Sequence, residues 1–419
     1  MAGLSTVPPC AAGASRRAAL AAHNQTSPEQ IPLPVPEYDV VVIGCGPAGA
    51  TTARVAAEGG LRVLLVDRKQ ELGAPIQCSG ALSAHALRDA RLAPHDDFIA
   101  APVFGFAISN AEGQTVTLDY RQLKPEKYRH RPLGYVVDRR RFDRHLATQA
   151  ERAGATLWLK TEAHGYTPRQ DGRAEVRLSR LGEPLTVRCR VLVGADGVQS
   201  QVGKWAGLST HVKLSELASC LQWVVDGVET NGLLEIVTGH RFAPGGYAWL
   251  FPKENGYAEV GVGVIRTMTD RDARWHLQEF VHRSFMADRF KNSRILEIQA
   301  GGVPLAAPLQ KQVADNLLLV GDAARHVNPV TGGGIHTAMQ SGFIAGEFLA
   351  DFLARGQPPS AGNLAGYQRR WQAQVGHVLW KLYRQKSRIF REPDIRRRDR
   401  QLYRLLAGYF HPDSEFRKV

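Results

Sequence analysis

The residues best suited to chemistry in this sequence are glycines and an acid with the spacing of a dinucleotide site. Gly44, Gly46 and Gly49 form a Gly-x-Gly-x-x-Gly turn after an apolar run, and Asp67 ends the next apolar run. In such a turn the first glycine allows a tight bend, the second lets backbone amides approach a pyrophosphate, and the third lets helix and sheet pack closely. Ala48 lies in the same turn, where a helix N-terminus would face the phosphates. Asp67 is placed to accept hydrogen bonds from a ribose.

The elements that must position these residues can be read from the pattern around them. The apolar run from Tyr38 to Ile43 predicts a buried parallel strand. A helix is expected from Pro47 to about Glu58, with proline in its first turn, and a second strand from Val63 to Val66. Together these make one βαβ unit, which is the structural context that a dinucleotide fingerprint needs.

Two more acid-containing turns follow strand-like runs later in the chain. The first reads Gly-Ala-Asp-Gly and contains Asp196, and the second reads Gly-Asp-Ala-Ala and contains Asp322. A triple-glycine stretch ending at Gly334 comes next, and a long helix is expected from Ile335 to Leu353.

An aromatic stripe marks a second, antiparallel sheet. The segment from Glu216 to Ile265 alternates in strand fashion, and Tyr247, Trp249 and Phe251 fall on one face because side chains alternate along a strand. Such a stripe is usually part of a core. Here Pro244, Gly245 and Gly246 before the stripe, and Pro252 after it, break the strand context.

Composition limits the classes of protein to consider. The chain has 419 residues, 44% hydrophobic and 22% charged, which suits a globular protein of α/β class. No apolar run reaches the roughly 18 to 20 residues of a membrane span. The net charge of +13 favours anionic partners such as phospholipid headgroups, diphosphates or an acidic redox protein, and no nucleic-acid module is recognisable. Five cysteines without CxxC spacing indicate a reduced cytoplasmic protein with no metal site.

The three turns in this order resemble the flavoprotein group typified by aromatic hydroxylases, in which the cofactor is FAD. The resemblance implies a Rossmann-like FAD-binding domain with a second, antiparallel sheet. It also implies roles for single residues: Asp196 in a turn near the flavin, Asp322 on the ribityl chain, and the helix start at Gly334 and Ile335 aimed at the flavin pyrimidine. Two more residues join the implied cofactor contacts, Arg139 at the FAD diphosphate and Ala163.

A narrower resemblance connects the chain to geranylgeranyl reductases. Pro244–Lys253 matches the PxxYxWxFPK signature of that family, and Pro304–Gly342 and Pro75–Gly80 are similar as well. The resemblance places Cys78 over the flavin as a catalytic residue, followed by Ser79, and makes Tyr247, Trp249 and Phe251 the wall for an isoprenoid chain. It leaves open whether Cys78 donates a proton or only shapes the pocket.

The activity implied by the resemblance is FAD-dependent saturation of double bonds in a geranylgeranyl chain. The substrate would be a prenyl lipid, a prenyl diphosphate or a pigment, and the external reductant NADPH or reduced ferredoxin. The alternative is a monooxygenase or halogenase of the same fold. A non-enzymatic escort protein sharing the glycine turn is a third hypothesis, disfavoured because all three turns are retained.

The expected domains follow from these motifs. Residues 37–102, 132–210 and 302–355 would form a discontinuous FAD-binding domain, and residues 103–131 and 211–301 a substrate domain. Residues 1–36 are expected to be a disordered tail, with a transit peptide as the alternative. Residues 356–419 are expected to form a basic helical segment, a candidate contact for a membrane surface.

Overall fold

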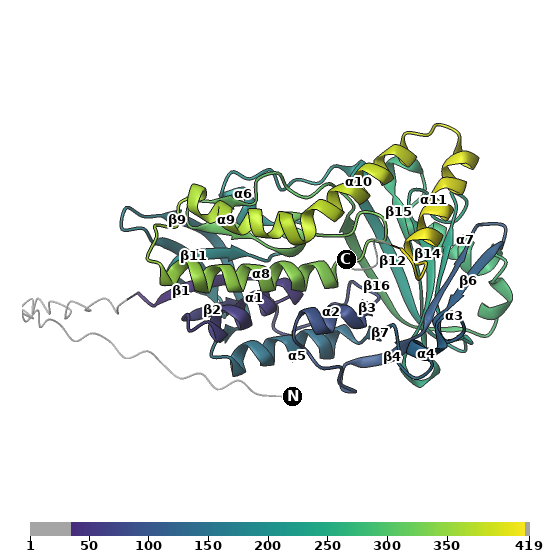
Figure 1. Ribbon diagram of the computed structural model, residues 1–419, viewed down its shortest axis with the longest axis horizontal. Coiled ribbons are helices and arrows are strands. Elements are labelled where there is room, and N and C mark those ends of the chain that lie inside the picture. The colour runs from purple at the N-terminus through teal and green to yellow at the C-terminus, as the bar shows by residue number, and fades with distance from the viewer. Residues whose placement is uncertain (1–34, 415–419) are drawn as a thin grey trace, which may run out of the picture. The chain divides into compact units, whose positions relative to one another are not determined.

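The structure is a computed structural model that describes residues 35–414 (Figure 1). Contacts join the chain from Pro36 onward into one compact unit. The tail predicted for residues 1–36 lies almost wholly outside the described residues. Because these contacts do not divide the chain at the expected boundaries, the assignment of an FAD-binding and a substrate domain stays a prediction.

The βαβ unit predicted at the start of the chain is confirmed. β1 (Glu37–Ile43), α1 (Pro47–Glu58) and β2 (Val63–Val66) follow one another, and the two strands pair in parallel. Along β1, Val40 and Val42 pack into one core cluster, and Val41 and Ile43 pack into another. The strand is therefore buried on both faces, which explains its unbroken apolar run.

These strands lie in an eight-stranded sheet, here called the first sheet. Its main path runs β17-β18-β11-β1-β2-β8, and β10 and β9 extend it from β11. The pairs from β18 to β8 are parallel, whereas β9, β10 and β17 pair antiparallel. The remaining bounds are β8 (Thr156–Trp158), β9 (Thr161–Pro168), β10 (Ala174–Arg180), β11 (Glu183–Gly194), β17 (Val313–Ala314) and β18 (Leu317–Leu319).

Three helices cover one face of the first sheet (Figure 1): α1, α5 (Arg139–Arg152) and α8 (Ile335–Ala354) contribute to the same core cluster. The long helix predicted after the triple glycine is thereby confirmed. Small residues let α8 approach α1 closely, since a Cβ at Gly342 would lie 2.4 Å from the carbonyl oxygen of Ala48. The short helix α6 (Gln201–Trp205) lies on the other face, where Val202 and Trp205 join the second cluster.

The second sheet has seven strands in the order β16-β12-β15-β14-β13-β5-β6. Its pairs are antiparallel as predicted, except that β13 and β5 pair in parallel. Helix α7 (Ala273–Arg283) packs on one face. The strand bounds are β5 (Gly105–Ser109), β6 (Thr115–Asp119), β12 (Leu217–Asp226), β13 (Leu234–Thr238), β14 (Tyr247–Pro252), β15 (Ala258–Ile265) and β16 (Arg294–Pro304).

A three-stranded sheet, β3-β7-β4, joins these parts. It consists of β3 (Ala81–Ser83), β4 (Ile99–Val103) and β7 (Gly134–Val137). Helix α2 (Ala84–Asp89) follows β3 directly, since Leu82 pairs with β7 and the side chain of Ser83 caps the helix. Two single-turn helices, α3 (Tyr120–Leu123) and α4 (Pro125–Tyr128), follow β6.

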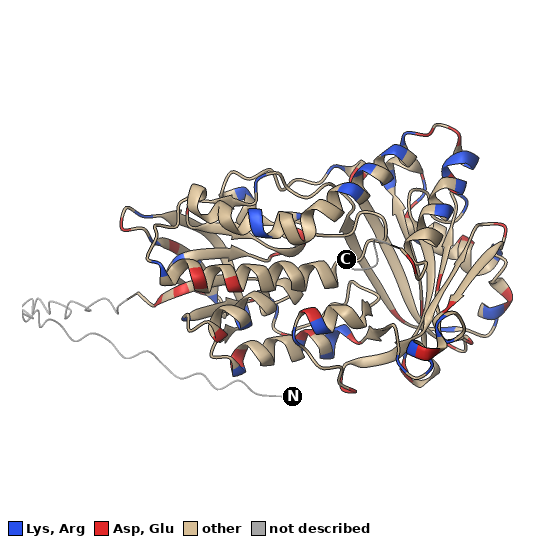
Figure 2. Ribbon diagram, viewed as in Figure 1, with Lys and Arg blue, Asp and Glu red and all other residues tan. Residues whose placement is uncertain are grey.

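The C-terminal segment is helical, as predicted. α9 (Ala361–Trp371), a π-helical turn (Gln372–Gly376) and α10 (His377–Phe390) form one continuous run, and α11 (Ile395–Tyr409) turns back over the second sheet (Figure 1). Figure 2 shows Lys and Arg residues along α10 and α11. Among the residues that the structure describes, no helix is long and apolar enough to cross a membrane.

Candidate flavin site and substrate cavities

Residues from distant parts of the sequence line one cavity, here called the cofactor cavity, at the carboxyl end of β1. The glycine turn, the start of α5, the turn after β18 and the start of α8 all contribute to it. Seven of the residues predicted for the site lie in its wall: Gly46, Ala48, Cys78, Arg139, Asp322, Gly334 and Ile335.

The glycine turn has the shape that a dinucleotide needs. Gly44 has φ +103°, and a Cβ there would lie 2.4 Å from the carbonyl oxygen of Ala195. A Cβ at Gly49 would lie 1.8 Å from the carbonyl oxygen of Gly44, so helix and turn touch there. Gly46 has no atom near its missing side chain and faces the open cavity. The three glycines therefore allow the bend, the approach of a ligand and the close packing that their spacing predicts.

Asp67 fixes the glycine turn by accepting hydrogen bonds from the backbone. Its Oδ2 accepts a hydrogen bond from the backbone N–H of Cys45 at 2.8 Å, and its Oδ1 accepts one from the N–H of Lys69 at 2.9 Å. Asp67 itself is not in the wall of the cofactor cavity, whereas Lys69 is. A carboxylate has further lone pairs, so these two bonds leave acceptor capacity for the ribose that the sequence predicts.

Arg139 supplies a fixed positive charge in the wall of the cofactor cavity. Its guanidinium forms two parallel hydrogen bonds of 2.9 Å with Asp143 one turn along α5, and only 16% of the side chain is exposed. Burial by itself lowers the pKa of Arg139, but the charges of Asp143 and Cys78 more than offset this and raise it. The guanidinium is thus held charged and in one orientation, which suits a phosphate group.

Two helix N-termini also face the cofactor cavity without a side-chain cap. α1 begins after Gly46 and α8 after Gly334, and neither has a side chain bonded to its first N–H groups. Asp322 lies nearby, and burial raises its pKa to about 6 although the charge of Arg139 acts to lower it. Uncapped helix starts, two cations and the carboxyl of Asp322 fit the diphosphate, ribityl and pyrimidine groups of FAD.

Six of the predicted cofactor residues lie outside the wall of this cavity: Gly44, Gly49 and Asp67, which shape the glycine turn, and Ser79, Asp196 and Ala163. Asp196 accepts hydrogen bonds from Ser200, Gln201 and Val202, so its carboxylate caps the start of α6, and its neighbours Ala195 and Gly197 line the cavity instead. Ala163 lies on β9, opposite Leu178, and packs against the core beside the first sheet.

Two further cavities meet the cofactor cavity at Cys78 and Gly332, which line all three. We call them the first cavity, over β12, β14 and β16, and the second cavity, over β5, β13 and β3. They enclose about 880 and about 1260 Å³ of space, open mouths included.

The three predicted aromatic residues separate and line these two cavities. Tyr247 borders both, Trp249 borders the first and Phe251 borders the second. Their rings contact one another along β14, with centroids 5.8 Å and 6.3 Å apart. The opposite strand leaves room for them, since a Cβ at Gly261 would lie 2.4 Å from the indole ring of Trp249.

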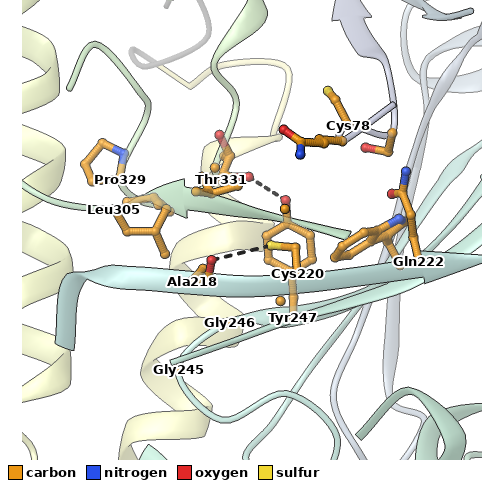
Figure 3. A pocket seen from close by; sticks show the side chains of 18 of the residues that line it. Cys78, Ala218, Cys220, Gln222, Gly245, Gly246, Tyr247, Leu305, Pro329 and Thr331 are labelled. Carbon is orange, nitrogen blue, oxygen red and sulfur yellow. Dashed lines mark hydrogen bonds between the residues drawn. The ribbon is translucent and has the colours of Figure 1, made fainter. Parts of the chain in front are cut away.

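Figure 3 shows how Cys78, Cys220 and Tyr247 lie around the first cavity. The hydroxyl of Tyr247 donates to the backbone oxygen of Thr331, beside the triple glycine that leads into α8. Burial raises the pKa of Cys220 to about 12, and the nearby Cys78 adds to the effect. The backbone N–H of Gly80 lies 3.4 Å from the Cys78 sulfur and donates to it. Ser79 lines both substrate cavities.

The sequence reasoning missed several residues of these cavities. Lys69 and Gly332 lie in motifs that were recognised, but no role was given to them. Cys220 and Lys386 come from segments that were interpreted only as strand and basic helix. Lys386 could have been found, because it continues the apolar stripe of Leu379, Leu382 and Ile389 on α10.

The comparisons with known proteins agree with this geometry. Residues 37–375 match the family described as FAD binding domain. The digeranylgeranylglycerophospholipid reductase of Methanothrix thermoacetophila is 39% identical over 343 residues, covering 81% of this chain and 84% of that protein. Digeranylgeranylglycerophospholipid reductase 1 of Methanothermobacter thermautotrophicus is 37% identical over 388 residues, covering 92% of this chain and 93% of that protein.

Solved structures give the same result at the level of the fold. The crystal structure of a geranylgeranyl bacteriochlorophyll reductase-like protein from Thermoplasma acidophilum is similar with a TM-score of 0.78 at 27% identity, covering 90% of this chain and 98% of that one. A flavin-dependent brominase is similar with a TM-score of 0.67 at 20% identity, covering 91% and 96%, and at that identity shares the fold alone. The protein is an FAD-dependent oxidoreductase and belongs to the geranylgeranyl reductase family.

Proposed function

We propose that this protein reduces the isolated double bonds of geranylgeranyl chains on a membrane lipid. The observation that carries the proposal is the junction at Cys78 and Gly332, two residues that line the cofactor cavity and both aromatic-lined cavities. A long apolar chain that spans both cavities would pass the junction. The name shared by the relatives above supports a digeranylgeranyl glycerophospholipid as the substrate.

Saturating an unactivated alkene requires a hydride at one carbon and a proton at the other. FAD supplies the hydride when it is bound and reduced. The protein must hold the bond in line and exclude water. Tyr247, Trp249 and Phe251 provide an apolar surface for the chain, and we assign Cys78, at the junction, to the reacting bond.

The proposal extends to the roles of the cofactor residues. Gly44, Gly46, Ala48 and Gly49 would hold the diphosphate at the start of α1, together with Arg139. Asp67 would bind the adenosine ribose and Asp322 the ribityl chain, and the start of α8 at Gly334 and Ile335 would face the pyrimidine. Asp196 would act indirectly, by fixing the position of its neighbour Ala195 in the cavity wall. Ala163 would act indirectly as well, through its place in the first sheet.

The reducing equivalents and the route of the lipid complete the proposal. Since the chain has a single complete glycine fingerprint, NADPH would dock transiently or a reduced ferredoxin would deliver the electrons.

The outer faces of α10 and α11 carry exposed arginines, and the inner faces contribute Lys386, Phe390 and Leu402 to the first cavity. A basic surface beside the cavity suits contact with an anionic membrane from which the lipid would be taken.

The experiment incubates the FAD-loaded protein with dithionite and digeranylgeranylglyceryl phosphate, and follows the lipid by mass spectrometry. We expect successive mass increments of two hydrogen atoms. Parallel reactions offer geranylgeranyl diphosphate and geranylgeraniol. If no prenyl compound gains hydrogen while the bound flavin is fully reduced, the proposed function is wrong. Turnover that instead requires oxygen or halide would identify a monooxygenase or halogenase.

A further inference from the structure

One lysine of the basic C-terminal helices points inward. On α10, Lys381, Arg384 and Arg388 are exposed, whereas Lys386 is only 4% exposed and lies on the buried stripe with Leu379, Leu382 and Ile389. Lysines are rarely buried unless their charge is used. An apolar residue at this position would pack as well, so stability does not explain the cation.

The ammonium of Lys386 is only partly satisfied by the protein. It donates to the backbone oxygen of Leu305 and lies 5.4 Å from the ring centres of Tyr383 and Phe390. It forms no ion pair with a carboxylate in the described part of the chain, and the nearby Glu216 instead accepts a 2.5 Å hydrogen bond from the Tyr383 hydroxyl. Burial lowers the pKa of Lys386 to about 8, although Glu216 acts to raise it. The group is therefore a cation with unused donors at neutral pH.

The first cavity is where those donors can be used. Lys386 is the one charged residue among the described residues of its wall. Two other buried polar atoms of this wall have no partner, Nε1 of Trp249 and Nε2 of Gln299, and both are donors as well. The two N–H groups are themselves buried, so the accessible charge of the wall is the ammonium of Lys386. A cavity with a cation and no carboxylate among its described lining residues favours a ligand whose polar part accepts hydrogen bonds.

Lys386 lines the same cavity as the two junction residues, Cys78 and Gly332, and Leu305 connects it to Gly332. A Cβ at Gly332 would be 3.6 Å from Val303 Cγ1 and 3.9 Å from Leu305 Cδ2, and Leu305 is the residue whose carbonyl accepts from Lys386. A ligand group held by the ammonium would therefore have a fixed place relative to Cys78 and the reacting bond. Fixing one end of a chain is what determines which of its bonds reaches a reactive centre.

We propose that Lys386 binds the phosphate group of the prenyl substrate inside the first cavity and so sets the register of the prenyl chain at the flavin. This inference rests on the proposed function and adds the part of the substrate that this cavity recognises. Lys386 acts as a binding and positioning residue: it holds an oxyanion and takes no part in the transfer of hydride or proton. An uncharged prenyl alcohol would lack this contact.

The test measures binding without turnover, using the FAD-loaded protein and saturated ligands in calorimetric titrations. Wild-type protein should bind phytanyl phosphate about tenfold or more tightly than phytanol, because a hydrogen bond to a charged group is lost with the alcohol. Lys386→Met should abolish this preference without weakening phytanol, and Lys386→Arg should retain part of it. Lys381→Met, on the exposed face of the same helix, is the matched control and should keep the wild-type preference.

A second pair of ligands, diphytanylglyceryl phosphate and diphytanylglycerol, distinguishes the headgroup of a two-chain lipid from a single-chain prenyl phosphate. A preference that depends on Lys386 in either pair supports the inference. The inference is overturned if the preference is absent from both pairs, or if Lys386→Met weakens the phosphate and the alcohol equally while FAD content is unchanged. Failure of every saturated chain to bind wild-type protein would instead contradict the proposed function.

Discussion

At the scale of single residues, the site separates side chains that hold charge from side chains that meet the substrate. Among the described residues of the cofactor cavity wall, Arg139 and Lys69 are the cations, and Asp143 and Asp322 carry the carboxyl groups. Cys78 is shared with both substrate cavities. Single substitutions should therefore affect either cofactor binding or reduction of the lipid.

Cys78→Ala should leave FAD binding within about threefold of wild type and lower the rate of lipid reduction about tenfold or more, since the thiol lies at the junction rather than among the diphosphate contacts. Flavin absorbance and single-turnover assays measure the two quantities. Cys78→Ser separates the roles that the thiol could have: recovery of the rate would indicate a hydroxyl can replace it as a proton donor. A rate unchanged in Cys78→Ala would contradict a catalytic role.

Arg139→Met should weaken FAD binding about tenfold or more, because it removes a charge from the cofactor cavity and leaves Asp143, itself 8% exposed, without its partner. Equilibrium dialysis against FAD measures this. The control is Arg144→Met on the same helix, whose ion pair with Glu71 is about half exposed on both sides and contributes little. Equal losses in both variants would show that the effect comes from α5 as a whole.

Glu259 should make the stability depend on pH. It is fully buried on β15, where Lys253 donates to it at 3.1 Å. Burial raises its pKa from 4.5 to about 7, and the charge of Lys253 opposes the shift. A carboxyl whose pKa is raised on folding takes up a proton, so its contribution is present below pH 4.5 and is lost as the pH rises to about 7.

Glu259→Gln should remove that part of the pH dependence. Urea unfolding of the FAD-loaded protein near pH 4.5 and above pH 7 should show a smaller fall in the free energy of unfolding for the variant than for wild type. The same fall in both proteins would mean that Glu259 does not titrate in this range.

At the scale of elements, the second sheet owes its cavity to the pairing of β14 with β15. Trp249 lies opposite Gly261, and the indole ring occupies the space where a side chain would be. The aromatic stripe can thus lie against its own sheet and leave space above it. Over the first sheet, the missing side chain of Gly342 likewise leaves room, in this case for α8 to pack closely against α1.

Gly261→Ala should displace Trp249 and disturb the first cavity. Overpacking of this kind typically costs about 1–3 kcal/mol of unfolding free energy, and binding of phytanyl ligands should weaken while FAD binding is retained. Gly408→Ala on α11 is the control, because nothing lies near its missing side chain. It should be neutral or stabilising by up to about 1 kcal/mol. Unchanged ligand binding in Gly261→Ala would argue against the first cavity as a lipid site.

At the scale of the whole molecule, the C-terminal helices link the cavities to the surface. Phe390 and Leu402 line the first cavity from α10 and α11, and Tyr409 and Phe410 line the second. Exposed arginines occupy the opposite side of the same helices (Figure 2). The two C-terminal helices therefore carry exposed positive charge on one side and contribute to the cavities on the other.

The full chain should bind vesicles that contain anionic lipid more strongly than neutral ones, and the difference should shrink at high salt. Replacing Arg396, Arg397 and Arg400 with glutamine should reduce sedimentation with anionic vesicles several-fold. Replacing three exposed cations elsewhere, Arg62, Arg152 and Lys204, gives a variant of equal net charge as control. Equal losses in both variants would show that net charge, and not this surface, governs binding.

The sequence by itself determined the local chemistry of this protein. Gly44 to Gly49, the helix after them and Asp67 are close in the chain, so backbone sterics and hydrogen bonding within one βαβ unit define their geometry. The alternation of Tyr247, Trp249 and Phe251 is likewise a local property of a strand. These features, with the turns at Asp196 and Asp322, were sufficient for the fold class and the family.

Only the tertiary structure decided which residues meet. Cys78, Gly332 and Lys386 are far apart in the chain, and packing of the two sheets and of α10 brings them around one cavity. The carboxylate of Asp196 turns to α6 because unpaired N–H groups at that helix start compete for it, which no pattern in the sequence expresses. The apolar stripe of α10 could indicate that Lys386 points inward, but which cavity it lines depends on how α10 packs in the folded chain. Burial and long-range contacts depend on how the whole chain packs, whereas the spacing of a motif is a local property of the sequence.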